Sequence, residues 1–172
     1  SPFCITLDDV QAARQAIAGQ LQRTPCLIAP RLSKLTGATI VVKYETMNAT
    51  GSFKERGALN KLLTLTSEER ARGVIAMSAG NHAQAVAYHA ARLKIPATIV
   101  MPEQTPMVKV ENTRAHGANV VLFGETLYES QQEVERRIAR DKLVLIHPYD
   151  DALVMAGQGT IALEMLEDHP DL

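Results

Sequence analysis

Short apolar segments alternate with amphipathic segments along most of the chain. Four of the apolar segments are rich in β-branched and aliphatic residues and predict strands; they are residues 74–77, 98–101, 120–123 and 143–146. Each is followed by apolar positions at helical spacing, which predict helices at residues 82–93, 106–116, 127–140 and 154–166. This alternation indicates βαβ units, so we predict an α/β fold with a parallel sheet and helices on both faces.

The N-terminal part has a different pattern. A helix is predicted over residues 7–21, with Thr6 and Asp9 as its capping box and Pro25 beyond its end. A short helical piece at 31–34 and a β-branched strand at 39–44 follow. Polar stretches at 45–50 and 147–151 are predicted to join two lobes. Residues 48–148 would form the small lobe, and residues 1–47 and 149–172 would form part of the large lobe.

Composition narrows the class of protein. Hydrophobic residues make up 46% of the chain and aromatic residues only 4%, so the predicted core is aliphatic. A net charge of −1 gives no reason to expect nucleic acid or an anionic membrane as a partner. Cys4 and Cys26 fit no metal or redox spacing, and the sequence shows no signal peptide or membrane span. We therefore predict a cytoplasmic protein with reduced thiols and no metal site.

The first candidate for chemistry is Lys54. Ser52 and Glu55 have the spacing of a capping box, which would place Lys54 in the first turn of a helix. The positive end of the helix dipole should lower the pKa of this lysine. A free amine can attack a carbonyl to form a Schiff base. The simpler alternative is a solvated lysine, with Glu55 and Arg56 beside it in an exposed first turn.

The second candidate is the turn that follows the predicted strand 74–77. It contains Ser78, Ala79, Gly80, Asn81 and His82. Ligands bind at the carboxyl ends of parallel strands, and free N–H groups at a helix start suit a carboxylate or a phosphate. An ordinary strand-to-helix turn is the alternative. A third stretch, residues 156–160, is either a Gly-rich helix start or a place where two helices pack closely.

Taken together, these stretches resemble a known family. The matching segments are TGSFKERGA at 50–58, SAGNHAQ at 78–84 and AGQGT at 156–160. In this order and spacing they resemble the threonine/serine dehydratases, which are pyridoxal-phosphate enzymes of the tryptophan-synthase-β-like fold (fold type II), a group that also holds serine racemase. The resemblance implies a two-lobed fold, pyridoxal 5'-phosphate as cofactor, and a homo-oligomeric parent enzyme.

The resemblance also implies roles for single residues. Lys54 matches the lysine that forms a Schiff base with the cofactor and later moves the α-proton. Phe53 matches the residue packed near the cofactor ring, and Asn81 matches the asparagine that hydrogen-bonds the ring hydroxyl. The turn at 78–82 matches the loop that holds the substrate carboxylate. The implied reaction is α,β-elimination from L-threonine or L-serine, which yields a 2-oxo acid and ammonia.

One position separates two activities within this group. Serine racemases carry a serine where this chain has Ala79, and that serine acts as an acid/base on the opposite face of the cofactor. A methyl group cannot carry a proton, so the resemblance favours a dehydratase over a racemase. The preference between threonine and serine stays open, as does a biosynthetic or a catabolic role.

The resemblance covers only the N-terminal part of the family's catalytic unit. The sequence ends before the position of the family's tetraglycine loop for the cofactor phosphate, so we expect weak cofactor binding and little turnover from this chain alone. Uncovered apolar faces on helices 7–21 and 154–166 would favour oligomers or frayed ends.

Several other functions are weighed against the dehydratase. A nucleotide-binding Rossmann domain is disfavoured because no Gly-x-Gly-x-x-Gly follows the first strand. A non-catalytic domain that binds an amino acid is disfavoured by the presence of Lys54. Cysteine synthase and threonine synthase share the fold; Ala79 and the Gly157-Gln158-Gly159 run favour the dehydratases over them.

Overall fold

The computed structural model describes residues 5–172, and Cys4 lies outside this range. The helices are α1 (Leu7–Ile17), α2 (Pro30–Thr36), the 3-10 helix η1 (Glu45–Met47), α3 (Lys54–Leu63), α4 (Ser67–Arg72), α5 (Asn81–Arg92), α6 (Met107–Ala115), α7 (Leu127–Asp141) and α8 (Ala152–Asp168). The strands are β1 (Cys26–Ile28), β2 (Val41–Lys43), β3 (Val74–Met77), β4 (Ala97–Met101), β5 (Asn119–Leu122) and β6 (Val144–Leu145). None of the described helices has the length and hydropathy needed to cross a membrane.

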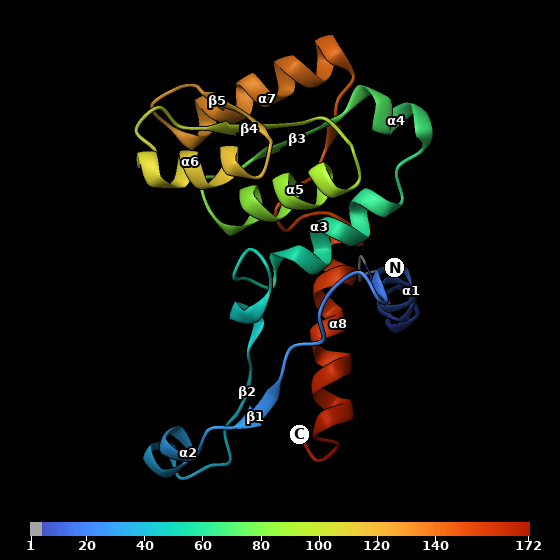
Figure 1. Ribbon diagram of the computed structural model, residues 1–172, viewed down its shortest axis with the longest axis vertical. Helices are drawn as coiled ribbons and strands as arrows, with labels where there is room; N and C mark the ends of the chain where they lie inside the picture. The colour runs from blue at the N-terminus through green and yellow to red at the C-terminus, as the bar shows by residue number, and fades with distance from the viewer. Residues whose placement is uncertain (1–4) are drawn as a thin grey trace.

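The larger of the two sheets is parallel, with strand order β5-β4-β3-β6, and lies toward one end of the molecule (Figure 1). Helix α7 covers one face, while α5 and α6 lie against the other (Figure 1). Val74 and Ile75 of β3 and Ile99 and Val100 of β4 are fully buried, because in a parallel sheet both faces are covered by helices. The prediction of an α/β fold with helices on both faces of a parallel sheet is therefore confirmed.

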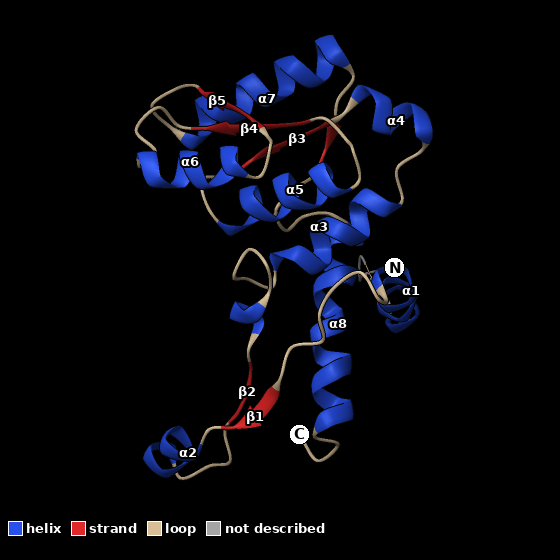
Figure 2. Cartoon of the chain, viewed as in Figure 1, coloured by secondary structure: helices blue, strands red, loops and turns tan. Residues whose placement is uncertain are grey.

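The antiparallel pair β1-β2 lies apart from this sheet. Figure 2 shows this pair extending away from the parallel sheet and from the helices that cover it, with α2 at its far end. Several apolar side chains of β1 and α2 are exposed; they are Leu27, Ile28, Leu32 and Leu35. The strand β1 and helix α2 thus expose apolar surface, as do the starts of α6 and α7, where Met107, Val108, Leu127 and Tyr128 are exposed. On the helices where the sequence predicted it, the large exposed apolar side chains are Leu7 in α1 and Leu166 in α8.

The predicted ends of several elements were wrong. The Thr6–Asp9 capping box forms, with Thr6 N donating to Asp9 Oδ2 at 2.7 Å. Helix α1 nevertheless stops at Ile17, before the predicted end at residue 21, because Ala18 leaves helical geometry and Gly19 takes the left-handed region with φ of 71°. Strand β1 and helix α4 were not predicted, since each is too short to show a period. Cys26 in β1 is a buried free thiol.

Helix α8 crosses α3 and carries the stretch 156–160 in its middle, so this stretch does not start a helix. A Cβ added to Gly157 would lie 2.6 Å from the Cα of Gly57 in α3, and a Cβ on Gly159 would meet the side chain of Val10 in α1. The two glycines thus let α8 approach two other helices closely. Of the two predictions for this stretch, close helix packing is confirmed.

Candidate active site

Lys54 is the first residue of α3 and lies beside the segment that joins β6 to α8. Its Nζ donates a hydrogen bond to the carbonyl oxygen of Pro148 at 2.7 Å and lies 5.3 Å from the centre of the Phe53 ring. Burial lowers the pKa of the Lys54 amine below its ordinary value. The predicted direction of the shift is confirmed, and loss of solvent is a cause of it that the sequence did not indicate. The Phe53 ring itself is partly exposed.

The start of α3 differs from the predicted capping box. Phe53 occupies the cap position and makes no side-chain cap bond, while Ser52 Oγ accepts only from Lys54 N at 3.3 Å. The Glu55 carboxylate reaches further back, where it accepts from Thr50 N at 2.5 Å and from Thr50 Oγ1 at 2.9 Å. The predicted Ser52–Glu55 capping box is therefore wrong, because the Glu55 carboxylate bonds to Thr50, five residues before it, and not to Ser52.

The two charged residues after Lys54 are both buried, so the alternative of an exposed first turn is also wrong. Glu55 is 1% exposed and Arg56 is 2% exposed. Burial of an ion is costly unless it is paired, and both residues have charged or polar partners. Glu55 lies 3.2 Å from His89 Nε2, whereas Arg56 binds the carboxylates of Glu45 and Glu164.

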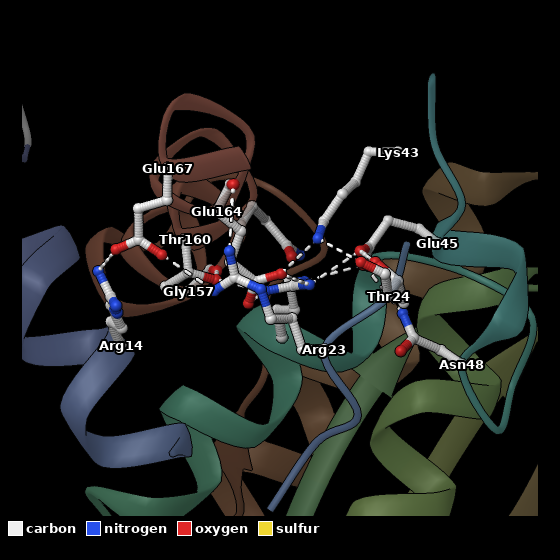
Figure 3. A network of polar contacts seen from close by, with 12 residues as sticks. Arg14, Arg23, Thr24, Lys43, Glu45, Asn48, Gly157, Thr160, Glu164 and Glu167 are labelled. Atoms are coloured by element: carbon white, nitrogen blue, oxygen red, sulfur yellow. Dashed lines mark hydrogen bonds and ion pairs between the residues drawn. The ribbon is translucent and has the colours of Figure 1, made fainter. Parts of the chain in front are cut away.

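Arg56 is the centre of a buried network of charges. Its guanidinium donates to Glu45 Oε2 and Oε1, both at 2.8 Å, and to Glu164 Oε1 at 2.7 Å and Oε2 at 2.8 Å. Lys43 pairs with Glu164 at 2.6 Å and donates to the carbonyl of Thr24. Figure 3 shows these groups converging from β2, η1 and α8. Burial is the largest single effect and disfavours the charged forms. The hydrogen bonds and charge of Arg56, together with Thr24 and Asn48 at Glu45 and with Lys43 at Glu164, outweigh burial and lower the pKa of both carboxylates.

Further contacts fix α3 against α8. Gly57 N donates to Gln158 Oε1 at 3.1 Å, which ties the backbone near the start of α3 to a side chain of α8. One turn later, Asn60 Nδ2 donates to the carbonyl of Leu153 at 2.7 Å. Lys61 pairs at 2.7 Å with Asp151, the residue that caps α8. The helix that carries Lys54 is therefore held along its length by specific polar contacts.

The loop at 78–82 follows β3 and leads directly into α5. Ser78 Oγ accepts from Gly80 N at 3.2 Å, and Gly80 caps α5 without any side-chain cap bond. Asn81, the first residue of α5, is exposed. The first-turn N–H groups of this helix thus lack a side-chain acceptor. Such a helix start can bind an anion.

His82 is the buried member of this loop. Its Nε2 lies 2.8 Å from the carbonyl oxygen of Ile146, and because a carbonyl only accepts, this nitrogen must carry the proton. Its Nδ1 is buried and has no partner in the structure. Burial, with smaller contributions from the charges of Lys54 and His147, lowers the pKa of His82 to about 4. His82 is therefore neutral at physiological pH.

A cavity of about 380 Å³ lies between the 78–82 loop and helix α7, and Lys54 is not among its lining residues. It is lined by Ser78 and Ala79 from the loop and by His147, Pro148 and Tyr149 from the segment after β6. Since Pro148 also accepts the hydrogen bond from Lys54, the amine and the loop meet around this segment. From the sequence, residues 147–151 were predicted only as a joint between two lobes, not as part of the site. The predicted strand 143–146 could have placed them there, because its carboxyl end reaches the same edge of the sheet as Ser78.

With this geometry in place, the class of protein can be stated. Residues 17–172 match the family described as pyridoxal-phosphate dependent enzymes. The match covers most of the chain, and the chain belongs to this family. The predicted family, fold and cofactor are therefore confirmed, since members of the family depend on pyridoxal phosphate.

Among curated proteins, the chain is similar to threonine-deaminating enzymes. It is 46% identical over 168 residues to L-threonine ammonia-lyase of Thermotoga maritima, which covers 98% of this chain and 42% of that protein. It is also 46% identical over 165 residues to catabolic L-threonine dehydratase TdcB of Staphylococcus aureus, covering 95% of this chain and 48% of that protein. The chain thus spans about half the length of the curated relatives it matches.

Solved structures give the same picture. Threonine deaminase isoform 2 of Solanum lycopersicum, in its processed form, aligns with a TM-score of 0.88 at 39% identity, over 96% of this chain and 45% of that one. Maize serine racemase aligns with a TM-score of 0.94 at 34% identity, over 98% of this chain and 51% of that one. The fold is thus shared by enzymes of both names, and only residues of the site can separate the two activities.

Proposed function

We propose that the protein containing this chain catalyses the α,β-elimination of L-threonine or L-serine to a 2-oxo acid and ammonia, with pyridoxal phosphate as cofactor. The proposal rests on the Lys54 amine, which is partly buried at the start of α3 and donates a hydrogen bond to the carbonyl of Pro148. The segment that contains Pro148 lines a cavity together with the 78–82 loop. Similarity to threonine ammonia-lyases supports the choice of reaction.

The groups present at this site fit such a cofactor and substrate. An amine with a lowered pKa suits covalent attachment to an aldehyde, and an exposed amide at Asn81 suits a ring hydroxyl. We assign cofactor binding to Lys54, Phe53 and Asn81. When bound, the cofactor supplies an electron sink for the bond that breaks at the substrate α-carbon.

The residues of the chain then have separate tasks. Lys54 Nζ would take the α-proton, because burial lowers the pKa of this amine and so raises the fraction that is uncharged and able to accept a proton. The first-turn N–H groups of α5, from Asn81 and His82 onward, would hold the substrate carboxylate, with Ser78, Ala79 and Gly80 shaping the loop. His82 contributes no positive charge to this anion site, because burial keeps it neutral.

We also propose the two-lobe division made from the sequence, with residues 48–148 as one lobe and residues 1–47 and 149–172 as part of the other. The support is that the hairpin β1-β2 and the C-terminal part of α8 both extend away from the sheet (Figure 1). Cytoplasmic location and a homo-oligomeric parent stay predictions.

A racemase is the second candidate, favoured by the structural similarity to serine racemases. Ala79 weighs against it, since a methyl group at this place in the loop cannot return a proton to the substrate. We therefore expect L-serine to give a 2-oxo acid and ammonia, with little D-serine. Substantial D-serine from the full-length protein would make the racemase the better assignment.

Reductive trapping tests the role of Lys54. The full-length protein is treated with pyridoxal phosphate and borohydride, and the labelled lysine is found by peptide mass mapping. We expect label on Lys54 in the wild type, loss of it in Lys54→Arg, and no change in Lys61→Arg on the same helix. Label spread over Lys34, Lys61 and Lys142 without preference for Lys54 would refute the proposal.

A further inference from the structure

Glu55 is a buried carboxylate that the proposed reaction does not use. It follows Lys54 directly in α3, and its two oxygens contact two different elements. Oε1 accepts from both donors of Thr50, in the turn before the helix, while Oε2 lies 3.2 Å from His89 Nε2 on α5. Glu55 therefore connects the turn that precedes Lys54 to a helix that packs on the sheet.

The protonation state of His89 follows from its neighbours. Arg92 Nη1 lies 3.1 Å from His89 Nδ1, and since a guanidinium can only donate, Nδ1 is the acceptor. The proton of the neutral ring is then on Nε2, facing Glu55. His89 Nε2 and Glu55 Oε2 lie 3.2 Å apart without forming a hydrogen bond, so the contact is mainly electrostatic. Burial disfavours the charged carboxylate, but His89 and Thr50 outweigh it and lower the pKa of Glu55.

The turn in front of Lys54 has few other supports from its own helix. Phe53 makes no side-chain cap bond, and Gly51 takes the left-handed region with φ of 70°. Asn48 holds the turn from the opposite side, where its side chain donates to the carbonyl of Ser52 at 3.1 Å. From the side of α3, the bonds of Glu55 to Thr50 close the turn.

We propose that Glu55, braced by His89, is a positioning residue that fixes the turn at residues 50–53 and thereby sets where the Lys54 amine lies. The inference rests on the proposed role of Lys54. It assigns a function to a buried carboxylate and the imidazole that contacts it, both placed away from the cavity, on the side of α3 that faces α5. Without this brace the first turn of α3 would open, and Lys54 would gain solvent.

The test measures the Lys54 amine directly, in the cofactor-free chain. Trace acetylation across a pH series, followed by mass spectrometry, gives the fraction of free amine at each lysine, with exposed Lys34 and Lys142 as internal references. We expect Glu55→Leu to shift the Lys54 profile to higher pH, because added solvent stabilises the ammonium. Labelling of Lys54 at neutral pH should then fall by about threefold or more. Glu55→Gln keeps an oxygen that can accept from Thr50, so labelling of Lys54 in this variant should be close to that of the wild type.

Glu133 on α7 offers a matched control. It is also a buried carboxylate with cationic partners, Arg136 and Arg137, but it lies on the opposite face of the sheet from α5. Glu133→Leu should destabilise the chain while leaving the Lys54 profile unchanged. An unchanged profile in folded Glu55→Leu, or an equal shift in Glu133→Leu, would overturn the proposal.

A milder variant decides the question if Glu55→Leu does not fold. Thr50→Val removes one of the two bonds to Glu55 and keeps the backbone donor, so we expect a smaller shift in the same direction. No shift in folded Thr50→Val would then overturn the proposal. Because acetylation needs no cofactor, this outcome leaves the trapping test of the proposed function intact.

Discussion

The sheet and the crossing of α3 with α8 are held together by different forces. In the sheet, β3 and β4 bury Val74, Ile75, Ile99 and Val100 completely, so burial of apolar surface dominates. At the crossing, Gly57 of α3 and Gly157 of α8 let the two helices approach closely, and a network of charges around Arg56 joins them. The stability that apolar burial provides depends on the total area buried, whereas the stability of the crossing depends on the positions of a few atoms.

This difference matters because α3 carries Lys54. A sheet core can repack around a changed aliphatic side chain at a modest cost. A buried ion that loses its partner cannot do so, because the remaining charge stays desolvated. We therefore expect single substitutions at the crossing to cost more stability than single substitutions in the sheet.

The largest effect is expected from Arg56→Met, which leaves Glu45 and Glu164 buried with only Lys43 to balance them. The loss of unfolding free energy should be about 3–5 kcal/mol, measured by urea denaturation. Arg23→Met is the control, since Arg23 pairs with Glu167 and Asp168 at the surface. Such exposed pairs contribute about 0–1 kcal/mol. Equal losses in the two variants would contradict the comparison.

A double variant sharpens this prediction. Arg56→Met combined with Glu45→Met keeps the pair between Lys43 and Glu164, so one buried cation still faces one buried carboxylate. We expect it to be more stable than Arg56→Met alone, because no unbalanced charge remains. If the double variant lost the sum of both single effects, charge balance would not be what holds the crossing.

The next effect is expected at Gly157. Its added Cβ would lie 2.6 Å from Gly57 Cα and 2.7 Å from the carbonyl oxygen of Arg56, and backbone atoms cannot move aside easily. Gly157→Ala should cost about 3 kcal/mol. In Gly159→Ala, the added Cβ would meet only the side chain of Val10, with its methyl groups at 2.9 Å and 3.1 Å, so this control should cost about 1 kcal/mol. Thermal denaturation of both variants measures the difference.

His82 provides a pH-dependent effect where the sheet meets the candidate site. Its pKa is about 4 in the folded chain and 6.5 without burial, so the unfolded chain binds a proton that the folded chain does not. The free energy of unfolding is therefore unaffected by this titration above pH 6.5, and it decreases as the pH falls from 6.5 to 4. At about pH 5 the loss is about 2 kcal/mol. His82→Gln should remove this dependence, whereas His116→Gln should keep it; the same acid profile in both would contradict the assignment.

The sheet could be predicted from the sequence because its signals are periodic. Four apolar runs, each followed by a helical pattern, located the strands within a few residues and predicted that they are parallel. The crossing had no such signal. Glu55 and Arg56 look like surface residues, and nothing local shows that Arg56 meets Glu164, which lies far away in the sequence.

The candidate site was partly predictable for the same reason. Lys54 and the 78–82 loop stand at element starts, where turn residues mark them. The way Glu55 closes the turn at Thr50, and the approach of Pro148 to the amine, depend on tertiary packing that no capping pattern describes. The predicted Ser52–Glu55 box failed because a capping pattern describes only the local chain.

The smallest effect is expected in the sheet. Ile99→Val removes one methylene from a fully buried side chain in β4, and Ile75→Val does the same in β3. Each should cost about 1 kcal/mol, because the loss is a transfer term plus a small cavity. One methylene lost from the sheet would then cost about a third as much as one methyl added at Gly157. If either sheet variant lost as much stability as Gly157→Ala, apolar packing would be as exacting as the helix crossing, and the two regions would not differ in kind.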